Sequence, residues 1–147
     1  MATTTRLGLP LLEAGQAQKE IWHNEALALI DLAVQATVTA VGLDEPPAVP
    51  VPGACWIVGS NPTGAWRGQA LALALAGWTE GGWRFVTPRE GMAAWHQGTR
   101  SIVRYAEGQW RAAAVVAPAA GGATVDAEAR ATLASLIAGL RGLGLIA

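Results

Sequence analysis

Tryptophan is the residue that most constrains how this chain can fold. Six of its seven tryptophans lie between residues 54 and 113, and three of them stand two positions after a glycine. These strings are Gly64-Ala65-Trp66, Gly81-Gly82-Trp83 and Gly108-Gln109-Trp110. Glycine accepts the positive φ of a tight turn, and tryptophan gives the outgoing strand a large side chain to bury. We therefore predict a small antiparallel β-domain of hairpins, with strands near residues 56–58, 83–86, 102–105 and 110–112.

Two further segments border these predicted hairpins. Leu71, Leu73 and Leu75 alternate with alanines, which favours a half-buried strand, although alanine and leucine are also strong helix formers. Residues 43–53 contain four prolines, so this segment cannot be helical and is expected to be a stiff, extended connector.

The N-terminal region, from about residue 5 to residue 41, is predicted to be mostly helical. Its apolar residues recur at the spacing of one helix face: Leu27, Ile30, Val34, Val38 and Val41. The helix is expected to start at Asn24 and Glu25, or nearer Gln16, and to stop at Gly42.

The C-terminal region contains a second predicted helix after a flexible break at residues 117–122. Asp126 and Glu128 suit its first turn, and Arg141 suits its last turn before Gly142. Such an apolar helix must dock on its own domain or bundle with other copies, so we predict an oligomer interface. The predicted interface residues are Ala129, Leu133, Leu136, Ile137, Leu140 and Leu143.

Together these patterns predict an α+β chain with four segments. Residues 1–42 form an N-terminal helical anchor segment, and residues 43–53 form the proline-rich connector. Residues 54–116 form the antiparallel, tryptophan-rich β-domain, and residues 117–147 form a linker and an amphipathic oligomerisation helix.

Composition points to protein partners. Hydrophobic residues make up 52% of the chain and charged residues 14%, against about 25% charged residues in a typical soluble domain. Some apolar surface is therefore expected to face a partner chain. The net charge of −1 argues against a nucleic-acid partner. The sequence shows neither a signal peptide nor an apolar run of membrane-spanning length, so we expect synthesis in the cytoplasm and no membrane partner.

Catalytic chemistry finds little support in the sequence, and we predict a protein that is not an enzyme and needs no metal or cofactor. His23 and His96 lack ligand spacing, and Cys55 lies in an apolar run typical of a buried, inert thiol. Glycan hydrolysis requires two close carboxylates. The β-region offers Glu80, Glu90 and Glu107, which are expected on exposed turns.

The tryptophans also suggest a rival function, because exposed indoles stack on sugar rings. Candidate carbohydrate or partner contacts are Trp66, Trp78, Trp83 and Trp95. Six arginines against three acids in the β-region would suit an anionic polysaccharide or an acidic partner. We favour the alternative that the tryptophans build the core, because the domain has few other large residues.

Several strings resemble a domain of unknown function found in alphaproteobacterial prophages and gene transfer agents. They are RLGLPLLEAGQAQKEIWHNEALALID (residues 6–31), PGACWIVG (52–59), GAWRGQ (64–69) and GWTEGGWRFVTPREGMAAW (77–95), followed by the Gln109-Trp110 hairpin. The GQAQKE…HNEAL string is the most specific of these. The closing helix is similar to the short helix that often ends phage fibre and spike subunits.

The resemblance implies a virion structural protein, such as a head-spike base or a fibre-attachment component, and implies no catalytic residues. We expect a homo-oligomer, trimeric or pentameric, that contacts capsid or fibre subunits and is released inside a particle by lysis. The N-terminal segment would attach to the particle, with candidate residues Gln16, Gln18, Lys19, His23 and Asn24. The alternative is a carbohydrate-binding module of a spike or tail fibre that recognises host capsular polysaccharide.

Overall fold

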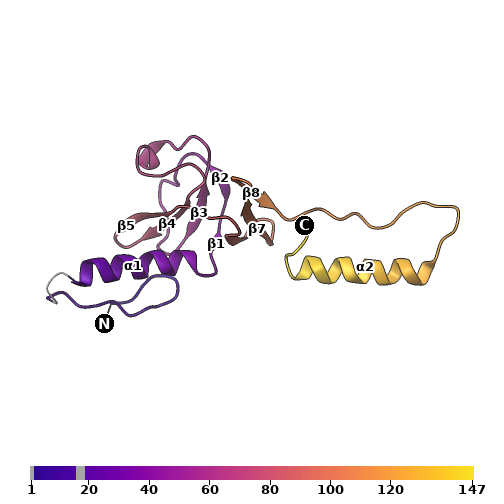
Figure 1. The fold of residues 1–147 in the computed structure, drawn as a ribbon, viewed down its shortest axis with the longest axis horizontal. Coiled ribbons are helices and arrows are strands. Elements are labelled where there is room, and N and C mark those ends of the chain that lie inside the picture. Colours follow the sequence, from indigo (N-terminus) through magenta and orange to yellow (C-terminus); the bar gives the residue numbers. More distant parts are fainter. Residues whose placement is uncertain (1, 16–18) are drawn as a thin grey trace.

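The computed structural model describes residues 2–15 and 19–147 and shows an elongated α+β protein (Figure 1). Two helices flank two small sheets, which confirms the predicted fold class. The helices are α1 (Lys19–Ala33) and α2 (Ala127–Gly142), with a short 3-10 helix, η1, at Gly64–Trp66. The strands are β1 (Thr37–Val38), β2 (Val41–Leu43), β3 (Cys55–Val58), β4 (Leu75–Thr79), β5 (Gly82–Val86), β6 (Ala93–His96), β7 (Ser101–Ala106) and β8 (Gln109–Ala112).

The eight strands form two four-stranded sheets, with the orders β1-β6-β7-β8 and β2-β3-β4-β5. The hairpins β4–β5, β6–β7 and β7–β8 are antiparallel, whereas β1 and β2 pair in parallel with β6 and β3. The short stretch between β1 and β2 joins the sheets, because Thr39 N donates to Cys55 O (2.8 Å) and Ile57 N donates to Ala40 O (3.0 Å). The two sheets therefore share one continuous body.

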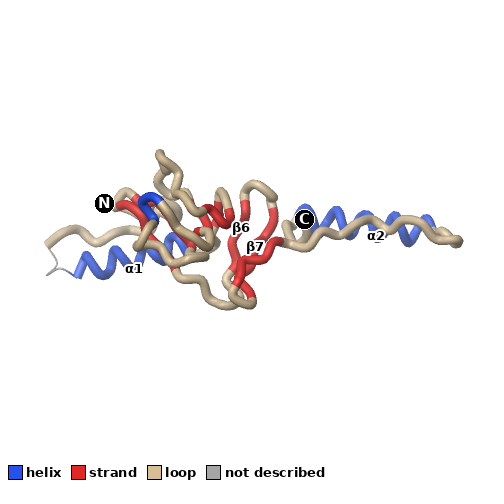
Figure 2. Tube along the Cα trace, turned by 90° about the horizontal axis from the view of Figure 1, so that it is seen from above, coloured by secondary structure: helices blue, strands red, loops and turns tan. Residues whose placement is uncertain are grey.

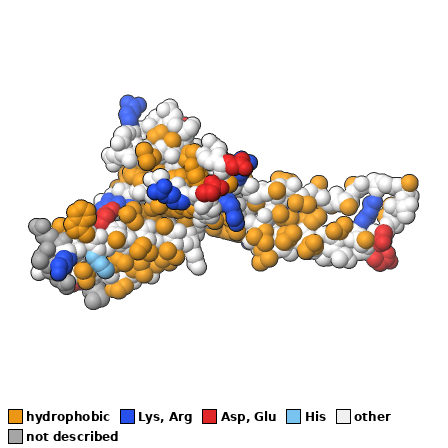
Figure 3. All heavy atoms as spheres, viewed as in Figure 1, with side chains coloured by type: hydrophobic (Ala, Val, Ile, Leu, Met, Phe, Trp, Pro, Cys, Tyr) orange, Lys and Arg blue, Asp and Glu red, His pale blue; other side chains and the backbone are white. Residues whose placement is uncertain are grey.

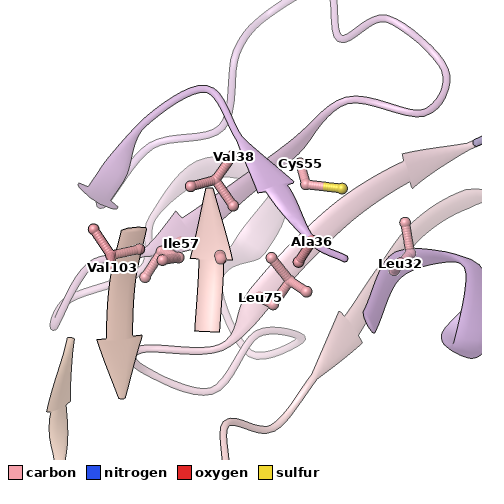
Figure 4. Packing of buried hydrophobic residues seen from close by; sticks show 8 residues of the cluster. Leu32, Ala36, Val38, Cys55, Ile57, Leu75 and Val103 are labelled. Atoms are coloured by element: carbon pink, nitrogen blue, oxygen red, sulfur yellow. The ribbon is translucent and has the colours of Figure 1, made fainter. Parts of the chain in front are cut away.

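The first core cluster lies between α1 and the two sheets (Figure 4). Its buried members include Leu32 from α1, Val38 from β1, Ile57 from β3 and Val103 from β7. Gly77 of β4 is needed beneath the helix, because a Cβ at this position would lie 2.3 Å from Leu32 Cδ2. Burying aliphatic side chains of this size stabilises the body by roughly 1.5–3 kcal/mol each.

The helix α1 ends at Ala33, so the predicted helix to Val41 is wrong. Val38 and Val41 lie in strands, and Gln35 adopts a left-handed φ of 48° that breaks the helix. The apolar spacing continues past Ala33, but the β-branched residues from Thr37 onward favour the extended backbone, where they pair with β6 and β3.

Two further expectations are corrected between β3 and β4. Residues 71–74 form a turn, and Leu73 has a left-handed φ of 65°, so the predicted strand over residues 71–75 begins only at Leu75. The Gly64-Ala65-Trp66 string forms η1 and does not start a hairpin strand. The other two Gly-x-Trp strings do form the β4–β5 and β7–β8 hairpins, as predicted.

The helix α2 projects from the body beside an extended segment, residues 113–126, which we call the arm (Figures 1 and 2). Asp126 caps the helix, since its carboxylate accepts from Ala129 N at 2.8 Å. No α2 residue is buried. After α2 the chain returns to the sheet, where Ile102 N donates to Gly144 O (2.9 Å) and Ala147 N donates to Ala114 O (2.9 Å).

Candidate functional site

One pocket lies between the N-terminal loop (residues 2–15), α1 and the β4–β5 turn. It has a volume of about 290 Å³. Thr3, Thr4 and Thr5 form one wall, and Leu11, Ile21 and Ala28 supply apolar surface. Its charged residues are Glu25, Asp31, Glu80 and Arg84.

Asp31 is the most buried of these charged residues, with 1% of its surface exposed. Its carboxylate accepts hydrogen bonds from Thr4 Oγ1 (2.8 Å), Arg6 N (2.9 Å) and Leu7 N (2.5 Å). A buried carboxylate is stable only when such donors replace its water. Asp31 therefore fastens the N-terminal loop onto α1, and its oxygens are already engaged.

Arg6 completes this attachment from the opposite side. Its guanidinium donates to the carbonyl oxygens of Asp31, Leu32 (3.1 Å) and Gln35 (2.9 Å) at the end of α1. These carbonyls would otherwise lack helical partners, and a cation is favoured at the C-terminal end of a helix. The sequence did not lead us to predict a role for Asp31 or Arg6. The available signal for Asp31 was its position as a single carboxylate inside the apolar run ALALIDLA.

Three other polar residues of the pocket, Asn24, Glu25 and Arg84, also hold structural contacts. Asn24 accepts from Leu12 N and donates to Leu12 O, both at 2.9 Å. The Arg84 guanidinium pairs with Glu25 at 2.8 Å, which ties β5 to α1. Asn24 was predicted to attach the chain to a particle, but its amide is occupied by the N-terminal loop.

The carboxylates considered for glycan hydrolysis do not share a pocket. Glu80 lies at the β4–β5 turn and lines the pocket beside α1. Glu90 and Glu107 are exposed neighbours on other turns, where Glu90 Oε2 accepts from Glu107 N (3.1 Å) and the Glu107 carboxylate pairs with Arg111. Glu80 therefore does not form with Glu90 or Glu107 the pair of carboxylates across a cleft that glycoside hydrolysis requires.

Cys55 lies in the first core cluster with 1% of its surface exposed. Burial raises the pKa of this thiol, while the nearby charge of Arg6 lowers it and that of Asp31 raises it to a smaller extent. A thiol that resists deprotonation is a poor nucleophile. The geometry is that of a packing residue, as the apolar run around it suggests.

A second core cluster gathers most of the tryptophans on the other face of β3 and β4. Trp83 lies at its centre, with ring centroids 5.5 Å from Trp56, 5.2 Å from Trp66 and 5.0 Å from Trp78. The rings meet edge to face, which is a favourable arrangement for aromatic pairs. Trp66 is 0% exposed and presents no face to a ligand, so it cannot serve as the carbohydrate contact considered above. Trp78 and Trp83 are half-buried in the same cluster.

Trp95 lies apart from this cluster, on the outer face of the β6–β7 hairpin. Gly144 packs against its ring so closely that a Cβ there would lie 2.2 Å from Trp95 Cζ3. Gly144 also has a φ of 69°, which favours glycine. The ring of Trp95 thus holds the chain where it returns from α2.

The predicted interface residues on α2 remain uncovered or half-covered. Leu133, Leu136 and Leu143 expose 47%, 57% and 67% of their surface, and Ala129 is also exposed. Ile137 and Leu140 are half-buried. Figure 3 shows the hydrophobic side chains gathered along this projection.

The residues predicted to attach the chain to a particle lie at the start of α1. Gln16 and Gln18 lie outside the described residues, whereas Lys19 and His23 are exposed. The sequence reasoning missed Trp22 beside them, which exposes 81% of its surface, more than any other tryptophan described.

Residues 2–15 and 19–147 contain neither a metal-binding cluster nor a membrane-spanning helix. This part of the chain has no group of three or more His, Cys, Asp or Glu side chains placed to hold a metal ion. None of the helices in the same ranges is long and apolar enough to cross a membrane.

Fold and surface together define a small α+β protein with a tryptophan core and an uncovered C-terminal helix. Residues 23–111 match the family described as protein of unknown function, DUF2793. The match covers more than half of the chain, so the chain belongs to this family. It spans most of α1, the strands β1 to β7 and most of β8, and α2 lies outside it. No curated protein matches the chain.

Proposed function

We propose that this chain is a structural subunit of a phage-like particle or gene transfer agent. In this role it is a head-spike base or fibre-attachment component that assembles as a homo-oligomer. The observation that carries the proposal is the exposed apolar surface of α2, where Leu133, Leu136 and Leu143 each lack cover in the single chain. Exposed apolar surface of this kind marks protein–protein contacts. The resemblance of the N-terminal strings to prophage proteins supplies the context.

The two ends of the molecule suit a connecting role. The start of α1 presents Lys19, Trp22 and His23 at one end, and α2 projects at the other (Figure 1). We assign the first surface to attachment to a capsid or fibre subunit. The second surface serves self-association. The body with its two cores lies between these surfaces.

The test is whether the chain is a component of particles. Particles from the encoding strain are purified on a density gradient, and the chain is quantified against the capsid protein by mass spectrometry. We expect a constant ratio across the particle peak, and loss of spike or fibre density in micrographs of particles from a deletion strain. A chain that is expressed but absent from purified particles overturns the proposal.

The alternative, a carbohydrate-binding module, has weaker support. Trp66 is buried, Trp78 and Trp83 pack in the second core, and Trp95 is covered in part by Gly144. A glycan array probed with the isolated chain tests it directly. Binding that survives Trp22→Ala and is lost in Trp78→Ala would favour the module.

A further inference from the structure

The projection made of the arm and α2 has an unusually apolar composition. Residues 113–147 contain four charged residues: Asp126, Glu128, Arg130 and Arg141. Both arginines turn back onto the arm, where Arg130 donates to Gly121 O and Arg141 donates to Val116 O (2.7 Å). Val115 and Val125 on the arm are also exposed, by 78% and 58%. A helix of this length is marginal alone in water, so packing against a partner is its main source of stability.

The spacing of the exposed side chains indicates what kind of partner fits. Ala129, Leu133, Leu136, Leu140 and Leu143 follow one another at alternating steps of four and three residues. This is the 3.5-residue period of a coiled-coil seam, in which each side chain inserts between residues of a facing helix. A second copy of this chain offers a helix with the same seam, which makes the contact self-complementary.

The two acidic residues of the projection, Asp126 and Glu128, lie at the far end of α2, where Figure 3 shows acidic side chains at the tip. Arg130 lies in the same part of the helix, with its guanidinium turned onto Gly121 O of the arm. At the near end, Arg104 and Arg111 stand directly opposite each other on β7 and β8. We call this pair the arginine face. Both line a pocket of about 270 Å³ together with Leu145, just after α2 ends.

The arginine face is electrostatically incomplete in the single chain. Like charges directly opposite on one sheet face destabilise the pair. Arg111 has Glu107 as a partner, but no carboxylate within residues 2–15 and 19–147 pairs with Arg104. The pocket between the two arginines is lined by no acidic residue. An anionic group from outside the chain would relieve this repulsion.

We propose that two copies pair through α2 in antiparallel orientation, so that the acidic tip of each helix lies on the arginine face of the other. Leu133 then packs against Leu143 of the second copy, and Leu136 packs against its Leu140. In this register Asp126 and Glu128 extend past the end of the facing helix and reach the level of its β7–β8 hairpin. A parallel bundle would instead place the acidic tips together and the arginine faces together.

This inference rests on the self-association in the proposed function and is independent of the assignment to a particle. It replaces the expected three-fold or five-fold bundle with a two-fold pair for this contact. Each copy contributes the same surface, so the interface is complete with two copies and adds no third. The two α1 ends lie far apart in such a pair. Such a dimer would bridge two attachment points.

Spin-label distances distinguish the orientations. A label is placed at Ala127→Cys, an exposed and uncharged position at the start of α2, in a Cys55→Ala background, and the mass in solution is measured by light scattering. For the antiparallel register we expect a dimer with the two labels roughly 33 Å apart, because the rise of about 22 helical residues separates them along the axis. In a parallel bundle the labels would lie about 10 Å apart, near the distance between helix axes, and that result overturns the orientation. A monomer overturns self-association and leaves the particle assignment to its own test.

Charge exchange tests the pairing of the tip with the arginine face. Glu128→Arg is expected to raise the dimer dissociation constant roughly 5- to 10-fold, and a second change, Arg104→Glu with Arg111→Glu, is expected to restore it. Glu80→Arg, at the exposed β4–β5 turn, is the matched control and should leave the constant unchanged. The proposed contact is contradicted if Glu128→Arg and the control Glu80→Arg weaken the dimer equally. It is also contradicted if Glu128→Arg does not weaken the dimer.

Discussion

Replacing Asp31 is the sharpest test of how the N-terminal loop is held. In Asp31→Ala, Thr4 Oγ1, Arg6 N and Leu7 N lose their common acceptor. A donor left without a partner costs about 1–3 kcal/mol when it stays buried, but part of this loop can open to water. We therefore expect a loss of about 3 kcal/mol in the free energy of unfolding, toward the lower end of the sum for three donors. The isosteric Asp31→Asn keeps one oxygen and should lose about 2 kcal/mol.

Tryptophan fluorescence during urea and thermal unfolding measures these differences. For a domain of this size, 3 kcal/mol corresponds to a fall in Tm of roughly 6–12 °C. Hydrogen exchange should show faster exchange of the Arg6 and Leu7 amides in both variants, with the strands still protected. Glu13→Gln, an exposed carboxylate of the same loop, is the matched control and should change stability by less than about 0.5 kcal/mol.

The result that refutes this reasoning is specific. If Asp31→Ala unfolds within about 0.5 kcal/mol of the parent and the Arg6 and Leu7 amides keep their protection, the carboxylate does not hold the loop. If stability falls but amide protection near Arg6 is unchanged, the loss comes from helix packing around Leu32.

Three other substitutions test the cores and the returning chain. Trp66→Ala should cost about 3–5 kcal/mol in urea unfolding, whereas Trp22→Ala, at an exposed position, should cost less than about 0.5 kcal/mol; equal costs would contradict the assigned core. Because burial raises the pKa of the Cys55 thiol, the unfolded chain releases this proton first, and stability should fall as the pH rises above about 8.5. A Cys55→Ala variant should lack this fall, and the native thiol should react with a thiol reagent only as fast as the protein opens. Gly144→Val should push the segment after α2 away from the Trp95 ring, because a side chain at this position collides with the indole. We expect a change in the near-ultraviolet circular dichroism of tryptophan, while the midpoint of urea unfolding stays the same.

Local patterns predicted those elements whose partners lie nearby in sequence. The hairpins around Gly82 and Gly108 and the helix capped by Asp126 each depend on residues within a few positions. These signals act through turn geometry and capping, which the local sequence determines. The oligomer interface predicted on this helix stays a prediction; in the single chain Leu133, Leu136 and Leu143 are exposed, and Ile137 and Leu140 are half-buried.

Predictions failed where distant segments decide the backbone. Val38 and Val41 continue the helical spacing of α1, yet they pair with β6 and β3, which follow much later in the chain. The strand β6 itself was not predicted, because its residues Ala93–His96 lack β-branched side chains. The contacts of Arg6 with the end of α1 join residues 25 to 29 positions apart, and no local pattern reveals such a contact.

The distribution of tryptophan exposure also bears on how the chain works. The chain has one phenylalanine and one tyrosine, so indoles are its main large residues for filling a core. Trp66 is fully buried, whereas Trp22 exposes 81% of its surface on α1 beside Lys19 and His23. A sugar that stacks on an exposed indole would bind best at Trp22, which lies on the surface assigned to particle attachment. In the proposed role one copy would not use that surface for both purposes, which is why the proposal leaves glycan recognition to a separate fibre.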